Sequence, residues 1–195
     1  MLAEWLTHLT TPCKEPYRKL GYLGELISIR HRHRRCKTAW QPHLDTCKKC
    51  ITTAASKVPH TKKAVVLGSG LLLDIPIDYL AKRFETVVLV DICHLRETRK
   101  IAKTYPNIEF IEADVSGVVD SLLNWNPGTE LSKPSTKSSF LDHADYVVSA
   151  NLLAQLPLTP LAYLEKIAPD LDAKQLRNFA AGILGHHLKL LNQLK

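Results

Sequence analysis

Glycines and carboxylates follow short apolar runs in the middle of the chain, and these residue types are suited to binding a nucleotide. Gly68 and Gly70 follow the run Ala64–Leu67, and glycine leaves the backbone open to close approach by a ligand. Asp91 follows the next such run, and its carboxylate can accept hydrogen bonds from both hydroxyls of a ribose. Asp114 follows a third run, in IEADV, and is placed to accept a hydrogen from an adenine amino group. The spacing indicates a site for a dinucleotide or an adenosyl cofactor.

Each of these positions also has an ordinary structural alternative. Asp91 and Asp114 could cap strand ends, and Asn151, which follows a fourth run in SANLLAQLP, could be a turn residue. The four positions nevertheless occur in chain order at the ends of successive apolar runs, and Ser69 lies between the two glycines. This order favours one binding site over a set of unrelated caps.

An alternation of strand and helix patterns after Lys63 must position these side chains. The predicted strands are Ala64–Leu67, Thr86–Val90, Ile108–Ile111 and Asp145–Ser149. The predicted helices lie near Ile75–Arg83, Leu95–Tyr105, Pro160–Ile167 and Ala173–Leu194, and a loop is expected over Asn124–Phe140. Such alternation is typical of an α/β fold with a parallel sheet and right-handed crossovers. Folds of this kind bind ligands at the carboxyl ends of their strands.

Composition indicates one globular domain with a basic appendage. Of the 195 residues 45% are hydrophobic and 23% are charged, and no apolar stretch approaches the roughly 20 residues that span a bilayer. We therefore expect no membrane association. Residues 1–63 hold 13 of the 26 Lys and Arg with only four acids, so the net charge of +7 belongs to this part. Five cysteines without framework spacing, and no readable secretory signal, favour a cytoplasmic protein with reduced thiols.

Residues 1–61 are predicted to form a basic helical cap on a cofactor-binding domain of residues 62–195. A first helix is expected over Tyr17–Lys37, where leucine and isoleucine recur every three or four residues. A second helix is expected to begin at Pro42 and to present one apolar face, made by Leu44, Cys47, Ile51 and Ala54 or Ala55.

The run RHRHRRCK, Arg30–Lys37, is the sharpest charge feature of the cap. It covers about two helical turns, so every face of the helix there is positive, and contact with RNA or DNA phosphates is possible. The alternative is a solvated helix end, where the dipole favours cations. No aromatic residue interleaves with these charges as a stacking surface would require, so the sequence alone does not favour nucleic acid.

The cap also gathers cysteine and histidine. His43, Cys47 and Cys50 would share one face of the second helix, and Cys36 could supply a fourth zinc ligand. A single CxxC without a second pair is weak support for a metal site, and Cys47 falls within the apolar stripe. We therefore favour core packing, and we predict no metal.

The ordered set of strand-end residues resembles the class I S-adenosylmethionine-dependent methyltransferases, over about residues 62–160. The resemblance implies a Rossmann-like fold with S-adenosyl-L-methionine as the cofactor. It implies that Gly68, Ser69 and Gly70 hold the methionine part and that Asp91 holds the ribose, while Ile92 packs against adenine. It further implies that Asp114 meets the adenine amino group and that Asn151 contacts the substrate or positions the methyl group.

The chain departs from the family pattern in its glycine turn and in its number of strands. Leu72 stands where many members have a third glycine, and the acid usually found before the first glycine is absent, with Asp74 as a conceivable substitute. The family has seven strands, whereas this chain supplies four, so the resemblance implies a sheet in the order 3-2-1-4 that lacks the C-terminal strands. Its fourth strand would be an open edge that needs covering by the last helix, by a second copy of the chain or by further sequence.

These features lead to one main functional expectation and two alternatives. The first is an S-adenosylmethionine-dependent methyltransferase whose acceptor is unknown. The second is a methyltransferase-like binding or scaffold protein without turnover, and the third is an NAD-dependent oxidoreductase, whose fingerprint would need glycine at Leu73. His94, His186 and His187 are the candidates for a general base, and none is assigned as catalytic. Methyl transfer from a sulfonium needs alignment more than acid or base catalysis.

Overall fold

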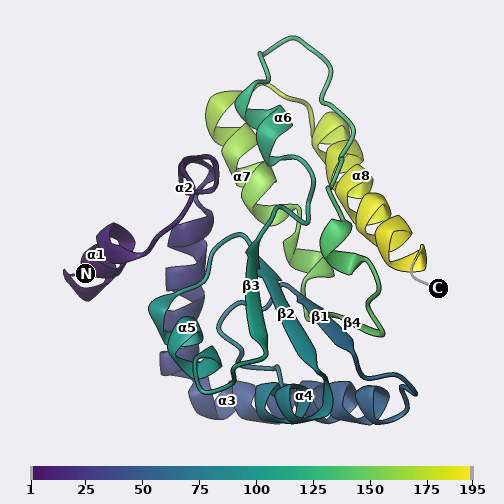
Figure 1. Ribbon diagram of the computed structural model, residues 1–195. Helices are drawn as coiled ribbons and strands as arrows, with labels where there is room; N and C mark the ends of the chain where they lie inside the picture. Colours follow the sequence, from purple (N-terminus) through teal and green to yellow (C-terminus); the bar gives the residue numbers. More distant parts are fainter. Residues whose placement is uncertain (1, 194–195) are drawn as a thin grey trace.

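The computed structural model describes residues 2–193 and contains a four-stranded parallel sheet flanked by helices (Figure 1). The strands are β1 Lys63–Leu67, β2 Thr86–Asp91, β3 Ile108–Glu112 and β4 Tyr146–Ser149. Their order is β3-β2-β1-β4, and all three pairings are parallel. The predicted α/β class, strand positions and strand order are therefore confirmed.

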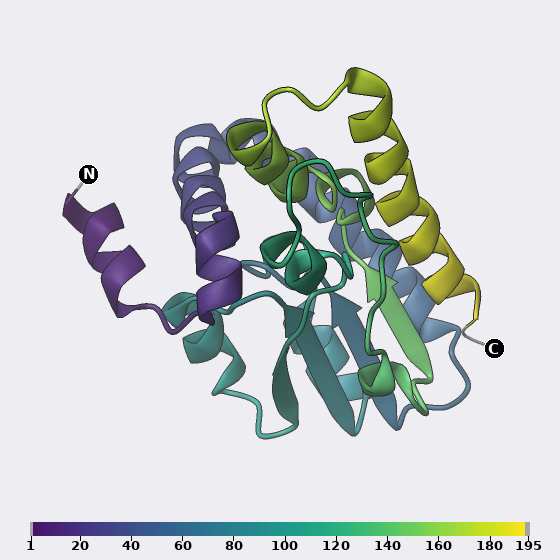
Figure 2. The ribbon, with the colours of Figure 1, turned by 90° about the horizontal axis from the view of Figure 1, so that it is seen from above.

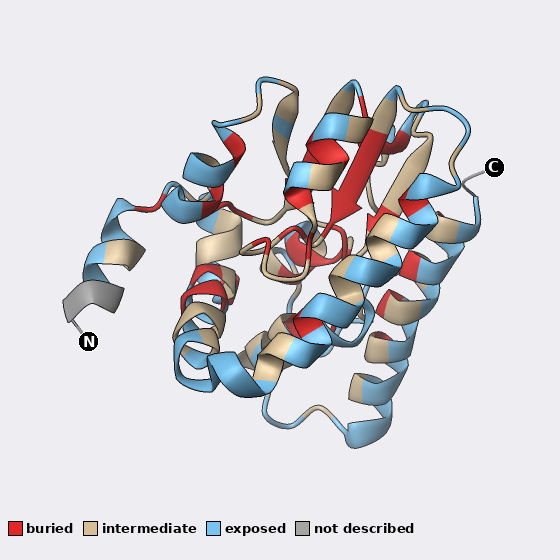
Figure 3. Ribbon diagram, turned by 90° about the horizontal axis from the view of Figure 1, so that it is seen from below, coloured by how far each residue is buried: buried red, intermediate tan, exposed pale blue. Residues whose placement is uncertain are grey.

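The two central strands are apolar on both faces because helices cover both faces of the sheet (Figure 3). Alternate residues of β1 and β2 enter two separate cores. Val65 and Leu67 pack in one core with residues of α6 Val119–Leu123, α7 Leu158–Ile167 and α8 Ala173–Asn192. Ala64 and Val66 pack in the other core with residues of α4 Ile77–Arg83 and the end of α3 Tyr22–Ser56.

Strand register brings the ends of β1, β2 and β4 side by side. Leu67 at the end of β1 pairs with Val90 on one side and with Ser149 on the other. On the next strand, Asp91 pairs with Glu112. Because the strands are parallel, the turns that follow them open at the same edge of the sheet.

The helices after β1 agree with the predicted ones in position, although α5 Arg96–Ala102 ends earlier than expected. Three short elements had no counterpart in the prediction, namely α6, η1 Ser139–Leu141 and η2 Leu153–Gln155. The start of α8 is fixed by a capping box, in which the Asp172 carboxylate accepts the backbone N–H of Gln175 while the Gln175 side chain accepts the N–H of Asp172.

The N-terminal segment forms α1 Leu2–Thr10, α2 Glu15–Leu20 and the long helix α3. The prediction of one helix over Tyr17–Lys37 was wrong at its start, because Gly21 adopts φ +100° and ends α2 there. The predicted division into two helical parts is confirmed, but the second part does not start at Pro42. The break lies at Cys36, whose backbone leaves the helical region (φ −108°, ψ 19°), and Pro42 lies inside the second part.

The bend gives α3 two arms that contact different parts of the molecule (Figures 1 and 2). In the first arm Leu23, Leu26 and Ile27 are buried against Cys93 and Leu95, which follow β2. In the second arm Leu44 and Ala55 are buried, as the apolar stripe predicted. Both arms of α3 therefore pack against the α/β part of the chain.

Helix α8 lies beside the edge strand β4 (Figure 2). Its buried His187 has Nε2 2.8 Å from the hydroxyl of Ser149, the last residue of β4. Within residues 2–193 no helix is long and apolar enough to cross a membrane.

Candidate functional site

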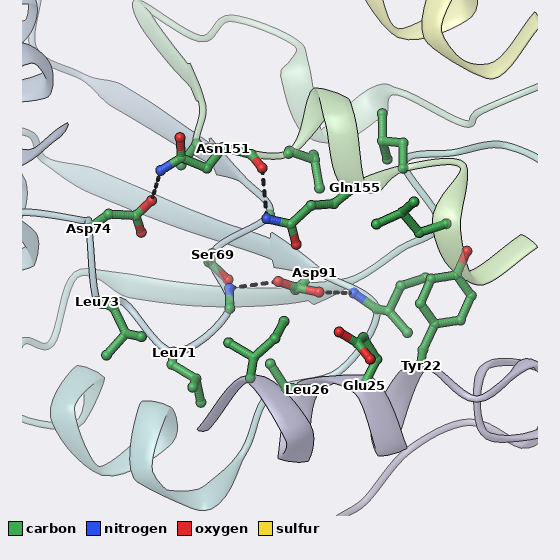
Figure 4. Close-up of a pocket in the computed structure, with 18 of the residues that line it drawn as sticks. Tyr22, Glu25, Leu26, Ser69, Leu71, Leu73, Asp74, Asp91, Asn151 and Gln155 are labelled. Carbon is green, nitrogen blue, oxygen red and sulfur yellow. Dashed lines mark hydrogen bonds between the residues drawn. The ribbon is translucent and has the colours of Figure 1, made fainter. Parts of the chain in front are cut away.

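A pocket of about 640 Å³ lies at the carboxyl ends of the strands, between them and the first part of α3 (Figure 4). Its lining includes every residue predicted for the site: Gly68, Ser69, Gly70, Asp91, Ile92, Asp114 and Asn151. The volume is in the range of small-molecule and cofactor sites. The structure thus brings the predicted residues to one place, and their individual surroundings differ.

The turn after β1 approaches the pocket with bare backbone. Gly68 and Gly70 have φ +72° and +48°, a region that side chains rarely adopt. A Cβ atom on Gly68 would lie 2.9 Å from Leu152 Cδ1, so a side chain there would displace Leu152 in addition to straining the backbone. Leu72, at the departure from the family pattern, also has a positive φ of 59° and is buried in the core.

The Ser69 side chain forms a hydrogen bond with a buried histidine, His94. Its hydroxyl lies 3.2 Å from His94 Nε2, and the His94 ring stacks edge-on against Phe110 with 4.7 Å between ring centroids. Burial, with a smaller contribution from Arg99, lowers the pKa of His94 to about 4, so the ring is neutral. His94 therefore fixes the turn and does not reach the pocket.

Asp91 lies at the centre of the inner wall. Its Oδ2 accepts the backbone N–H of Gly70 at 2.6 Å and its Oδ1 accepts that of Ile92 at 2.7 Å. Burial raises the pKa of Asp91 to about 6, although both hydrogen bonds act to lower it. Since a carboxylate has about four acceptor positions, one remains on each oxygen.

Most acceptor positions of the Asp114 carboxylate are filled by residues that follow it in the chain. Its Oδ1 accepts the backbone N–H of Ser116 at 2.8 Å and the Ser116 hydroxyl at 2.5 Å. Its Oδ2 accepts the N–H of Val119 at 2.8 Å, the first residue of α6. The alternative of a capping role for Asp114 is therefore realised, and one acceptor position stays open on Oδ2.

Asn151 joins the turns that follow β1 and β4. Its Nδ2 donates to Asp74 Oδ2 at 2.5 Å and lies 3.4 Å from Cys47 Sγ, while its backbone carbonyl accepts from Gln155 Nε2 at 3.0 Å (Figure 4). Its φ of +46° also places it in a turn. Asn151 and Gln155 are exposed, so this side of the pocket is its mouth.

Sequence reasoning missed the contribution of α3 to the pocket, whose polar and aromatic members are Tyr22, Glu25, Arg32, Trp40 and His43. Tyr22 faces the inner end, where burial and the nearby Asp114 raise the pKa of its phenol. Its hydroxyl is buried and has no hydrogen-bond partner of normal geometry within the described residues. The spacing of Tyr22, Leu26 and Ile29 on one helix face was the available signal, but only the fold shows what that face meets.

The histidine and cysteine candidates lie elsewhere or form only a pair. His186 contacts Thr136 and His187 contacts Ser149, and neither lines the pocket. His43 Nε2 lies 3.5 Å from Cys47 Sγ. Cys36 and Cys50 are exposed, and in the described part of the chain no three His, Cys, Asp or Glu side chains converge as metal ligands would.

Comparison with known proteins finds no matching family, no matching curated protein and no matching solved structure. The geometry itself defines the class of protein. It is a parallel α/β protein of Rossmann-like architecture with a pocket at the carboxyl ends of its strands, partly walled by an N-terminal helix.

Proposed function

We propose that this protein is an S-adenosylmethionine-dependent methyltransferase and that the pocket holds the cofactor. One observation carries the proposal. The glycine turn after β1, the carboxylate after β2 and the carboxylate after β3 line a single pocket in the order that this cofactor's parts require. An adenosyl group has two ribose hydroxyls and one amino group to satisfy, and the wall offers acceptors for both kinds of donor.

The acceptor positions on Asp91 and Asp114 match these donors in number. Asp91 has one open position on each oxygen, which suits the two hydroxyls of a ribose. Asp114 has one open position, on Oδ2, which suits one amino hydrogen. Ile92 lies directly after Asp91 in the same wall and supplies an apolar surface for a base.

The bare backbone at Gly68 and Gly70 leaves room for the remainder of the cofactor beside the turn. S-adenosylmethionine supplies an electrophilic methyl group on a sulfonium. The residues of this chain have to bind it, align it with an acceptor and exclude water, and none has to transfer a proton to start the reaction. The neutral, buried His94 serves this purpose by fixing the turn.

The exposed side of the pocket suits the acceptor. Asn151 and Gln155 present amide groups there, and Asp74 orients Asn151 through their hydrogen bond. We place the methyl acceptor at this mouth, above the turns after β1 and β4. An NAD-dependent reaction is less well supported, because Leu73 occupies a position where the dinucleotide fingerprint needs glycine.

A binding protein without turnover is the second candidate, and the use of Asp114 as a cap favours it to some extent. Three of its four acceptor positions are already filled, which leaves little freedom to adapt to a ligand. A methyl-release assay across RNA, protein and small-molecule acceptors separates the two candidates, since only an enzyme produces S-adenosylhomocysteine with time.

Calorimetric titration with S-adenosylhomocysteine tests the cofactor assignment directly. We expect binding to the unmodified chain, no binding of NAD, and a loss of affinity of at least ~10-fold in Asp91→Ala because charged hydrogen bonds are removed. Asp78→Ala, which changes an exposed acid on α4, is the matched control and should bind normally. Equal affinity in Asp91→Ala, or no binding by the folded protein, contradicts the proposal.

A further inference from the structure

The bend in α3 places the basic run at the rim of the pocket. Cys36, where the helix bends, lies within the run Arg30–Lys37, and residues 34–39 are all exposed. Arg32 from the run and Trp40 from just beyond the bend both line the pocket. A charged surface and the mouth of the candidate site are therefore continuous.

Part of this charge is neutralised within the chain and part is not. Arg30 Nη1 pairs with Glu97 at 2.8 Å, and Arg32 pairs with Glu25. Arg34, Arg35 and Lys37 form no ion pair with any residue that the structure describes. The charge of Arg34 still acts on Glu97, and Arg35 lines a second hollow together with His8. The three side chains are exposed, so anionic groups of a partner can reach them.

An aromatic side chain lies where the basic run meets the pocket. Trp40 is half-buried, and its ring centroid lies 6.0 Å from that of His33, which belongs to the basic run. The sequence showed no aromatic residue among the charges, and the fold supplies one from the next turn of the helix. A base can stack on such a ring while phosphates lie along the arginines.

The mouth beyond Trp40 offers polar groups suited to the edge of a base. The amides of Asn151 and Gln155 and the imidazole of His43 line it, and amide side chains hydrogen-bond well to purine and pyrimidine edges. A ring for stacking and amides for a base edge thus line one pocket, and the exposed cations precede that ring by three to six residues in the same helix.

We propose that the methyl acceptor is a single-stranded nucleic acid, bound with its phosphates on Arg34, Arg35 and Lys37 and one base in the pocket beside Trp40. That the nucleic acid is a methyl acceptor rests on the proposed methyltransferase function. Its binding can be measured without a cofactor. A single strand is favoured over a duplex because a stacked and paired base could not enter the mouth without being flipped out.

Fluorescence anisotropy with a labelled 20-nucleotide RNA and the same sequence as single-stranded DNA tests the surface. Three phosphate contacts predict that log K falls with log[salt] with a slope of roughly −2. The triple variant Arg34→Ala/Arg35→Ala/Lys37→Ala should bind at least ~10-fold more weakly at low salt and lose most of this slope. The matched control Lys166→Ala/Lys174→Ala/Arg177→Ala removes three exposed cations from α7 and α8 and should bind as the unmodified chain does.

Trp40→Leu separates stacking from charge. It should weaken binding about 5-fold or more at every salt concentration and leave the slope unchanged, since no cation is lost. Trp40→Phe keeps a ring and should recover most of the affinity.

Three outcomes overturn the inference: no salt-dependent binding of either strand, an equal loss in the control triple variant, or tighter binding to phosphatidylserine vesicles than to the oligonucleotides. The last would identify the basic surface as a lipid-binding one. If S-adenosylhomocysteine binds and nucleic acid does not, this inference fails alone. If nucleic acid binds and S-adenosylhomocysteine does not, the acceptor role fails together with the proposed function.

Discussion

The backbone N–H of Gly70 donates a 2.6 Å hydrogen bond to Oδ2 of Asp91, which joins the turn after β1 to the end of β2. The same carboxylate accepts the N–H of Ile92, so it fixes the backbone of the segments that follow both β1 and β2. Because its surroundings are largely dry, burial raises the pKa of Asp91 to about 6 despite these two donors. The residue that we assign to the ribose is therefore also an acid that titrates close to neutral pH.

We predict that Asp91 makes the free protein less stable as the pH rises through 6. Its folded pKa of about 6 lies above its ordinary value of 3.8, so folding favours the protonated form. The resulting stabilisation is complete below pH ~4 and is lost by pH ~7, with a size on the order of 2–3 kcal/mol. Urea denaturation of the unmodified chain and of Asp91→Asn at pH 4.5 and 7.5 measures it.

Asp91→Asn should have a smaller loss of stability over this interval, because the amide does not ionise. His94 acts in the opposite direction in both proteins. Its pKa is lowered from 6.5 to about 4 by burial, so its contribution to stability is present above pH 6.5 and is lost as the pH falls through that interval. The difference between the two proteins isolates Asp91, and identical pH profiles would rule out its raised pKa.

Cofactor affinity should rise with pH over the range in which the Asp91 contribution to the stability of the free protein falls. Ribose hydroxyls donate to an ionised carboxylate, so binding favours the charged form of Asp91 and releases a proton below its pKa. We expect the affinity for S-adenosylhomocysteine to rise up to ~10-fold per pH unit between pH 5 and 6 and to level off above 7. Titration calorimetry in two buffers of different ionisation enthalpy counts the proton. An affinity that stays constant over this range is the contrary result.

The strands and the glycine turn could be predicted because local sequence determines them. The runs around Val65 and Val88 are β-branched and apolar, as strands buried on both faces must be. Gly68 and Asp91 follow these runs directly, and a parallel sheet brings the residues after its strands to one edge whatever else the chain does. Their presence in one pocket thus depended on little beyond strand order.

The course of α3 could not be predicted, because proline signals a break without giving its place. Pro42 lacks an N–H, so the carbonyl of Thr38 in the preceding turn loses its helical partner. The helix bends still earlier, at Cys36, and then continues through the proline. Residues on both sides of that bend, such as Arg32 and Trp40, line the pocket.

The role of Asp114 could be predicted only in part. Its position after β3 suggested either a ligand contact or a cap, and the sequence V-S-G-V-V that follows did not show that its carboxylate would hold the start of α6. The link between Asn151 and Asp74 was hidden for a different reason. It joins residues 77 positions apart and depends on a left-handed backbone at Asn151, which no local pattern requires.

Gly68→Ala should destabilise the fold and disturb the pocket that we propose for the cofactor. The new Cβ would lie 2.9 Å from Leu152 Cδ1, and φ is +72°, so crowding and backbone strain add. We expect a loss of unfolding free energy on the order of 2–3 kcal/mol in chemical denaturation, with S-adenosylhomocysteine binding weakened at the same time.

Gly128→Ala is the matched control, since Gly128 has φ +92° and nothing within 4 Å of the added carbon. It should lose only the strain component, about 1–2 kcal/mol. The double variant Gly68→Ala/Leu152→Ala removes the crowding partner and should recover stability relative to the sum of its two single variants. Additive behaviour in this cycle would show that the Leu152 contact is unimportant.

Arg83 at the end of α4 should be needed to hold the second arm of α3 against the sheet. Its Nε donates to the Ala55 carbonyl at 2.8 Å, and its Nη2 donates to the carbonyls of Ser56 at 3.3 Å and Val58 at 2.7 Å. The Ala55 carbonyl also accepts the backbone N–H of Val58 at 3.2 Å. Arg83 therefore adds side-chain donors at and just beyond the last turn of α3, where helical partners become scarce. Arg83→Ala should lower the unfolding free energy by about 1–3 kcal/mol.

The neighbouring cation supplies the control for this last change. Lys82 is exposed on the same helix, and Lys82→Ala should alter stability by less than about 0.5 kcal/mol. Hydrogen exchange distinguishes a local from a global effect, since loss of the Arg83 contacts should raise exchange at residues 50–57 before it does so in β1 and β2. Exchange that rises equally in both places would mean that Arg83 stabilises the domain as a whole and not the attachment of α3.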